Sequence, residues 1–143
     1  MDNEILTNME TVNSHNNDSY NNIGKIDPQN IKMYVKTIIN ALENKKAENI
    51  QVIDIRHISA VADYFIIANG ANTSQIQALS DNVEEKLAAL GAFPKHIEGY
   101  HNANWILMDY LDILVHIFDK ESRGFYDLER LWRDGTAVAL SDF

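Results

Sequence analysis

Asp109 and Asp112 are the two residues whose type and spacing best fit metal-dependent chemistry in this sequence. A nucleotidyl-transfer enzyme needs two or three carboxylates that converge on one edge of a sheet and hold a pair of metal ions. The two aspartates flank a predicted hairpin turn, however, and an Asp in a turn usually accepts a hydrogen bond from its own backbone. The pattern therefore favours a structural turn, and a metal-dependent nucleotidyltransferase-like enzyme stays open as the alternative.

A second pair, His96 and Glu98, has the H-x-E spacing of zinc deaminases, in which the glutamate activates a zinc-bound water. Those enzymes also use cysteine ligands, and this chain has no cysteine. The same absence excludes disulfides, thiolate nucleophiles, zinc fingers and iron-sulfur clusters. We therefore attribute the H-x-E match to chance, with both residues on a solvated strand.

Two further parts of the sequence could have either a ligand-binding or catalytic role or a purely structural one. Residues 69–74 lie between a predicted strand and a predicted helix, where backbone amides can hold a phosphate. The segment has one Gly and no Lys, unlike a Walker loop or a dinucleotide-binding turn, and therefore predicts a plain connection. His116 lies between Val115 and Ile117, which favours a hydrogen-bonded histidine in a packed sheet over a ligand or a base.

The chain is acidic, with 21 Asp and Glu against 12 Lys and Arg and a net charge of -9. Binding to a phosphate backbone normally requires a basic surface, so we expect no direct contact with DNA. No apolar run approaches the length of a membrane span, and the N-terminus lacks a secretion signal. The simplest interpretation is a cytoplasmic protein with a basic protein partner.

Three segments have the apolar spacing of helices. The first begins at Asp27-Pro28, where Asp can cap a helix and Pro fits its first turn, and ends near Lys45-Lys46. The second follows Asn69-Gly70, with a capping box at Ser74 and Gln77 and a left-handed cap at Gly91. The third is a single helix at about 125–132, whose apolar side comprises Phe125, Leu128 and Trp132.

Five runs rich in Val, Ile, Tyr and Phe predict strands, at 52–58, 64–68, 96–98, 104–110 and 113–118. The last two are joined so tightly that they must form a hairpin. Together with the helices they predict an α/β (α+β) fold, a mixed five-stranded sheet flanked by helices. The predicted domain covers residues 28–134, after a disordered Asn-rich leader at 1–27 and before a tail at 135–143.

Aromatic residues gather around the predicted hairpin. Strand alternation places Trp105 and Asp109 on one face of the sheet and Tyr110 on the other. Most buried aromatic residues belong to the core, but Trp and Tyr also dominate the hot spots of protein interfaces. If helices cover only part of the sheet, an aromatic and acidic patch is left for a partner, and the residues alone leave both readings open.

Six segments in register resemble the Iojap/RsfS family of ribosomal silencing factors. The resemblance covers roughly residues 31 to 134, and its segments are Ala62-Asp63-Tyr64-Phe65-Ile66-Ile67-Ala68-Asn69-Gly70, Ser74-Gln75 through Ala78, His96-Ile97-Glu98-Gly99-Tyr100, Trp105-Ile106-Leu107-Met108-Asp109-Tyr110, Val115-His116-Ile117-Phe118, and Arg123-Gly124-Phe125-Tyr126-Asp127-Leu128-Glu129-Arg130-Leu131-Trp132.

The resemblance implies a nucleotidyltransferase-like topology without the catalytic carboxylates. It also implies a protein with no enzymatic activity, and hence no catalytic residue, no cofactor and no metal. It also implies a translation repressor that binds the large ribosomal subunit through large-subunit ribosomal protein fourteen. Such a factor sterically blocks association with the small subunit when nutrients are limiting. An acidic domain suits a basic ribosomal protein.

Carried over to this sequence, the resemblance places the partner-binding surface on the hairpin. Trp105 is the expected anchor, because it offers a large apolar area, and the carboxylates offer charge-assisted bonds to Lys or Arg. The remaining residues of the expected surface are Asp109, Tyr110, Leu111, Asp112, Tyr100, His116 and Tyr126.

Two positions depart from the family pattern. Leu111 stands where Gly is common between the two aspartates, and Leu is disfavoured at a positive φ, so the turn is expected to differ in shape. Gly124 replaces a larger residue, which weakens the start of the last helix. A homodimeric adaptor, in which the aromatic patch pairs with its own copy, is a further alternative.

Overall fold

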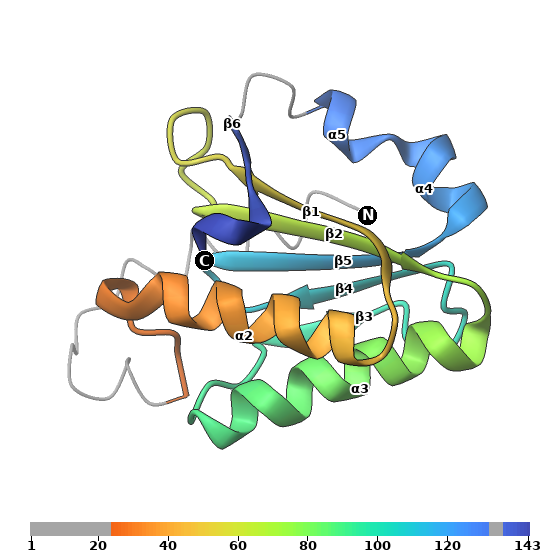
Figure 1. Cartoon of the computed structure of the whole chain (residues 1–143), viewed down its shortest axis with the longest axis horizontal. Helices are drawn as coiled ribbons and strands as arrows, with labels where there is room; N and C mark the ends of the chain where they lie inside the picture. The colour runs from red at the N-terminus through yellow and green to blue at the C-terminus, as the bar shows by residue number, and fades with distance from the viewer. Residues whose placement is uncertain (1–23, 132–135) are drawn as a thin grey trace.

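The computed structural model describes residues 24–131 and 136–143, so the predicted disorder of the leader lies largely outside the described residues. One mixed sheet separates two layers of helices (Figure 1). Its elements, in chain order, are the 3-10 helix η1 (Pro28–Asn30), α2 (Ile31–Asn44), β1 (Glu48–Asp54), β2 (Tyr64–Gly70), α3 (Thr73–Ala89), β3 (His96–Glu98), β4 (Trp105–Asp109), β5 (Ile113–Asp119), α4 (Lys120–Tyr126), α5 (Leu128–Leu131), β6 (Thr136–Val138) and η2 (Leu140–Asp142).

The strands are ordered β3-β4-β5-β2-β1-β6. The central pair, β2 and β5, is parallel, and the other neighbours are antiparallel. β4 and β5 form the predicted hairpin, with Trp105 opposite Phe118 and Leu107 opposite His116. This register puts Trp105 and His116 on the same face, so the hairpin and its alternation are confirmed.

The sheet has six strands in the described part of the chain, so the predicted count of five is wrong. The sixth strand, β6, lies in the segment predicted as a tail and pairs with β1, with Ala137 opposite Ile53. This short strand depends on the partner edge that β1 offers. Beyond it, Phe143 packs edge-on against Tyr64 with ring centroids 5.9 Å apart.

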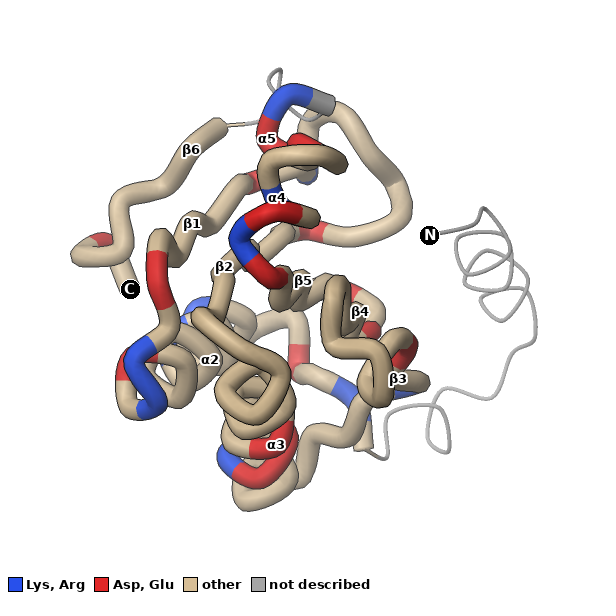
Figure 2. Tube along the Cα trace, turned by 90° about the vertical axis from the view of Figure 1, so that its right-hand side faces the viewer, with Lys and Arg blue, Asp and Glu red and all other residues tan. Residues whose placement is uncertain are grey.

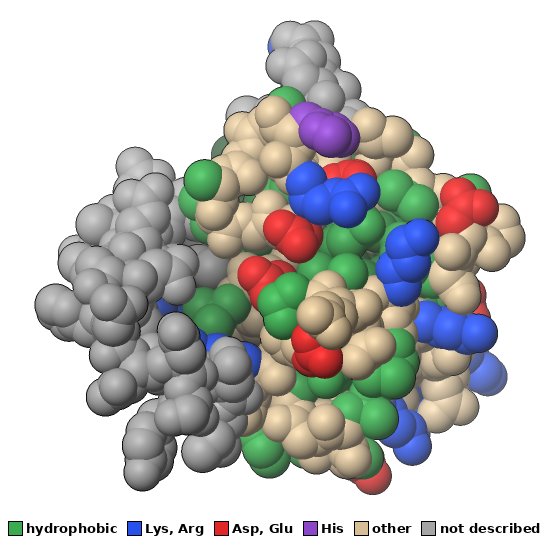
Figure 3. Space-filling view, turned by 90° about the vertical axis from the view of Figure 1, so that its left-hand side faces the viewer, with side chains coloured by type: hydrophobic (Ala, Val, Ile, Leu, Met, Phe, Trp, Pro, Cys, Tyr) green, Lys and Arg blue, Asp and Glu red, His purple; other side chains and the backbone are tan. Residues whose placement is uncertain are grey.

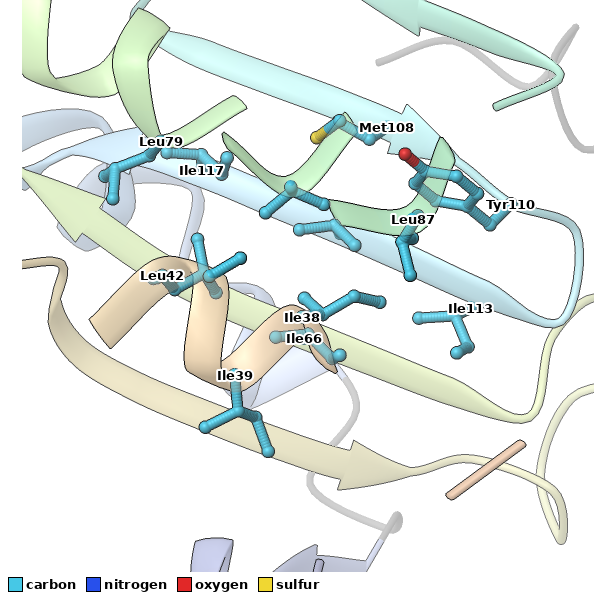
Figure 4. Packing of buried hydrophobic residues seen from close by; sticks show 14 of the residues in the cluster. Ile38, Ile39, Leu42, Ile66, Leu79, Leu87, Met108, Tyr110, Ile113 and Ile117 are labelled. Atoms are coloured by element: carbon cyan, nitrogen blue, oxygen red, sulfur yellow. The ribbon is translucent and has the colours of Figure 1, made fainter. Parts of the chain in front are cut away.

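Helices α2 and α3 cover one face of the sheet and enclose the larger core cluster (Figure 4). The helical apolar spacing predicted for the first helical segment is confirmed, because Val35, Ile38 and Leu42 of α2 are buried in this cluster. The Asp27 side chain accepts a hydrogen bond from the Gln29 amide, although the cap opens η1 and not the α-helix itself. Gly91 has the predicted left-handed conformation, with φ +81°.

Two predicted boundaries need correction. Asn72, and not Ser74, caps α3, because the Asn72 carboxamide accepts from the Gln75 amide at 2.8 Å. Its backbone is extended, which a cap requires, whereas Ser74 is already inside the helix. β1 begins four residues earlier than predicted and ends at Asp54, where the Asp54 carboxylate accepts from the Arg56 amide and turns the chain.

The single last helix that the sequence predicted is two short helices. Asp127 adopts a left-handed backbone, φ 47° and ψ 57°, and separates α4 from α5. Phe125 is 80% exposed while Leu128 is buried, so these two side chains do not share an apolar side. Trp132, the third predicted member of that side, lies outside the described residues.

Candidate protein-binding surface

An aromatic cluster lies on the sheet face that α4 and α5 cover. β4 and β5 supply Trp105, His116 and Phe118, and the end of α4 supplies Tyr126. The Trp105 ring stacks on Phe118 at 5.0 Å and lies 4.7 Å from the Tyr126 ring, both measured between centroids. The opposite sheet face has its own core beneath α2 and α3, so the strands place these aromatic rings beneath the smaller helical layer.

His116 fixes the indole of Trp105. The Trp105 Nε1-H donates to His116 Nδ1 at 3.1 Å, so Nδ1 carries no proton. His116 is completely buried, and burial lowers its pKa to about 3. The imidazole is therefore neutral at pH 7 with its proton on Nε2, for which the described residues offer no hydrogen-bond partner. The predicted hydrogen-bonded histidine inside a packed sheet is confirmed.

The Asp109 side chain and the Asp112 backbone amide each bond within the hairpin turn. The Asp109 carboxylate accepts from the Leu111 amide at 2.8 Å, as an Asp in a turn was predicted to do. The Asp112 amide donates to the Tyr110 carbonyl at 3.0 Å around Leu111, which has φ +70°. A hydrogen bond that spans three residues, around a central residue with a positive φ, defines a strained γ-turn. Leu111 therefore adopts the positive φ that is disfavoured for Leu.

The surroundings of the aspartates differ from those of a metal pair. Asp109 is buried, which raises its pKa, and its second oxygen lies 3.3 Å from His96 Nε2 outside hydrogen-bond geometry. Burial and the neighbouring Asp63 raise the pKa of Asp112. Within the described ranges, no group of three or more His, Asp or Glu side chains is arranged to hold a metal ion.

The structure brings together only part of the predicted surface. Trp105, His116 and Tyr126 are in ring contact, and Leu111 is partly buried against the same core cluster. Tyr110 belongs to the opposite cluster beneath α2 and α3. Tyr100 packs on that side too, and its hydroxyl donates to Asp81 of α3 at 3.1 Å. The sheet therefore separates these two tyrosines from the aromatic cluster.

The outermost part of this face is α4. Phe125 is 80% exposed and Tyr126 is 44% exposed, and acidic and basic residues lie on the same helix (Figure 2). The other end of the molecule shows small apolar areas broken up by acidic and basic side chains (Figure 3). No helix in the described part of the chain has the length and apolar composition needed to span a bilayer. An exposed aromatic pair beside Trp105 is the feature best suited to a protein partner.

Two residues that shape this surface were not predicted. Gly99 has φ +78°, and a Cβ atom there would lie 2.1 Å from the Trp105 carbonyl oxygen, so only glycine allows the connection before β4 to pass so close. Arg123 on α4 bonds to Asn69 and Glu129 and to the Asn49 carbonyl. Its partners lie on separate strands and helices, and no local pattern pairs them.

A family model described as "Ribosomal silencing factor during starvation" (RsfS) matches residues 28–143. The chain is 39% identical over 111 residues to the ribosomal silencing factor RsfS of Bacillus subtilis, covering 78% of this chain and 94% of that protein. It is 38% identical over 102 residues to RsfS of Halalkalibacterium halodurans, covering 71% and 87%.

The fold is similar to a crystal structure of a Chromobacterium violaceum protein, with a TM-score of 0.71 and 31% identity over 76% of this chain and 90% of that one. The match of the family model runs through the segment that forms β6, beyond residue 134 where the sequence resemblance ended. On these grounds the chain belongs to the ribosomal silencing factor (RsfS) family.

Proposed function

We propose that this protein represses translation by binding the large ribosomal subunit and sterically blocking its association with the small subunit. Its membership of the RsfS family, matched from residue 28 to residue 143, is the observation that carries this proposal. The direct partner is large-subunit ribosomal protein fourteen, and the setting is the cytoplasm under nutrient limitation. The mechanism is occupancy, so it needs neither catalysis nor a cofactor.

The contact surface in this proposal centres on Trp105 and Tyr126, with Leu111 and Asp112 at the hairpin turn. His116 and Asp109 are buried and support the surface from beneath, by orienting the indole and by holding the turn. Because the Trp105 N-H is already bonded to His116, the indole offers its apolar ring to a partner and not a hydrogen bond. Tyr100 and Tyr110 stay predicted contacts, although their side chains lie on the other side of the sheet.

The charge of the chain supports a basic partner. The net charge of -9 gives a field that attracts a basic ribosomal protein and speeds the encounter. Partly exposed carboxylates such as Asp112 can form charge-assisted hydrogen bonds to Lys or Arg. The aromatic surface then supplies apolar area, and the carboxylates fix the orientation of the partner.

Co-sedimentation with separated ribosomal subunits tests this proposal. Wild-type protein is expected to pellet with large subunits and not with small ones. Trp105→Ala should weaken binding by about 2 kcal/mol, roughly thirtyfold. Phe93→Ala is the matched control, because Phe93 is an exposed aromatic residue outside both core clusters. Equal loss in both variants would place the contact elsewhere, and no pelleting of wild type with large subunits would remove the proposal.

Homodimerisation through the same surface is a second candidate, favoured by the exposure of Phe125. An apolar side chain left 80% exposed beside other aromatic rings can pair with a second copy. Mass measurements over a dilution series should show a dimer that Phe125→Ala weakens. A monomer at all concentrations contradicts the dimer and leaves the silencing proposal intact.

A further inference from the structure

Helix α4 carries the exposed aromatic pair but has little apolar attachment of its own. None of its seven residues, all of them within the described part of the chain, is fully buried. Gly124 lies inside the helix, where an added Cβ would meet no atom within 4 Å, and Phe125 is 80% exposed. Tyr126 nevertheless lies against Trp105. Something other than apolar burial must hold α4 in this position.

The guanidinium of Arg123 supplies that attachment. Its Nη1 donates to the Asn69 side-chain oxygen at 2.7 Å and to the Asn49 carbonyl at 2.5 Å, and its Nε donates to Glu129 Oε1 at 2.9 Å. The side chain is only 12% exposed. One residue of α4 therefore reaches β1, β2 and α5 at once, with the fixed fork geometry that only Arg offers.

The partners of Arg123 are themselves held in place. Asn69 is buried near the end of β2, and its amide nitrogen donates to Glu48 at 3.2 Å, which turns the amide oxygen toward Arg123. Asn49 lies at the irregularity of β1, with φ +50°. Glu129 follows the left-handed break at Asp127, so its bond to Arg123 also links α5 to α4.

We propose that Arg123 is a positioning residue of the binding surface. By fastening α4 to the ends of β1 and β2, it holds Tyr126 against Trp105, and the surface binds its target only while α4 is fastened. This inference rests on the proposed function for its binding consequence, but the fastening itself is a property of the isolated protein. Arg123 acts through Tyr126 and does not itself contact the target.

Three variants and one control test the fastening in the isolated chain. Arg123→Met keeps the length of the side chain without its donors, Arg123→Lys keeps the charge without the fork, and Asn69→Ala removes one acceptor. Arg130→Met is the control, because Arg130 is an exposed arginine on α5. Circular dichroism first establishes that each variant folds. NOEs between the rings of Trp105 and Tyr126, and hydrogen exchange of α4 amides, then report the position of the helix.

Loss of the ring NOEs and faster exchange in α4, with both unchanged in Arg130→Met, is the expected result. Unchanged NOEs and exchange in the Arg123 variants would overturn the inference whatever the ribosome does. If Arg123→Met does not fold, Arg123→Lys and Asn69→Ala decide by the same two readouts.

Large-subunit binding tests the consequence. Because Met no longer holds α4 in place, Tyr126 is not kept against Trp105, and Arg123→Met should bind the large subunit about tenfold more weakly. In a Tyr126→Ala background the same substitution should change affinity little, because there is no longer a ring to position. Equal tenfold losses in both backgrounds would refute a role through Tyr126. If wild type itself does not bind, the proposed function fails. The NOE and exchange measurements alone then decide whether Arg123 holds α4 in place.

Discussion

Replacing His116 should remove a defined part of the pH dependence of stability. Burial lowers the pKa of this histidine from 6.5 to about 3 in the folded protein. Between these values the unfolded chain binds a proton at this position and the folded chain does not. The group therefore contributes full stability above pH 6.5 and loses it progressively as pH falls toward 3.

The size of the effect follows from the two pKa values. At pH 5 the unfolded state gains about 2 kcal/mol from protonating this histidine, and at pH 7 it gains a few tenths at most. Protonation in the folded state would also convert His116 Nδ1 from acceptor to donor and break its bond to the Trp105 indole. The protein should therefore lose about 2 kcal/mol of stability at this one site between pH 7 and pH 5.

Urea unfolding of wild type and His116→Gln at pH 7 and pH 5 measures this contribution. Gln retains an oxygen that can accept from the indole but does not titrate. Other titrating groups, including Asp109 and Asp112 with raised pKa values, act equally in both proteins and cancel in the comparison. The stability loss should be about 2 kcal/mol larger in wild type than in the variant. Equal losses would show that His116 is not held neutral in the folded state.

Three further predictions concern the turn and the connection around the aromatic cluster. Leu111→Gly should be about 1 kcal/mol more stable in urea unfolding than Leu111→Ala, because both lose the side chain but only Gly relieves the positive φ; equal stabilities would contradict a strained turn. Gly99→Ala should lower stability by about 2 kcal/mol or more in the same assay, since its Cβ would collide with the Trp105 carbonyl; a neutral result would mean that the connection moves freely. Adding Mg²⁺ or Mn²⁺ should leave the melting temperature unchanged, because Asp109 is committed to the turn; a saturable rise that disappears in Asp109→Asn would restore the enzymatic alternative.

The central hairpin was predictable because its signals are local. Strand alternation and a connection of three residues placed Trp105 on its face, and an apolar run around His116 predicted a buried, bonded imidazole. The turn chemistry of Asp109 was predictable for the same reason, since its hydrogen bond spans two residues. These features depend on neighbours in sequence and not on the rest of the fold.

The features that the sequence did not predict depend on distant partners. Arg123 bonds to residues 54 and 74 positions earlier in the chain, and no periodicity links them. β6 is a three-residue strand in the segment predicted as a tail, and it forms by pairing with the edge of β1. Asp127 adopts the left-handed conformation that separates α4 from α5. Asp can adopt this conformation, but the residue type alone does not predict it. Strand alternation predicted that Tyr110 and Trp105 lie on opposite faces of the sheet. It did not predict that helices cover both faces, because that covering depends on elements far apart in the chain.

A subunit-joining assay tests the proposed occupancy mechanism most directly. Large subunits are preincubated with wild type, Trp105→Ala or Phe93→Ala, small subunits are added, and the joined ribosome is followed by light scattering. Wild type and Phe93→Ala should suppress joining in proportion to the fraction of large subunits bound, while Trp105→Ala should require roughly thirtyfold more protein. Normal joining of large subunits that are saturated with wild-type protein would contradict the mechanism.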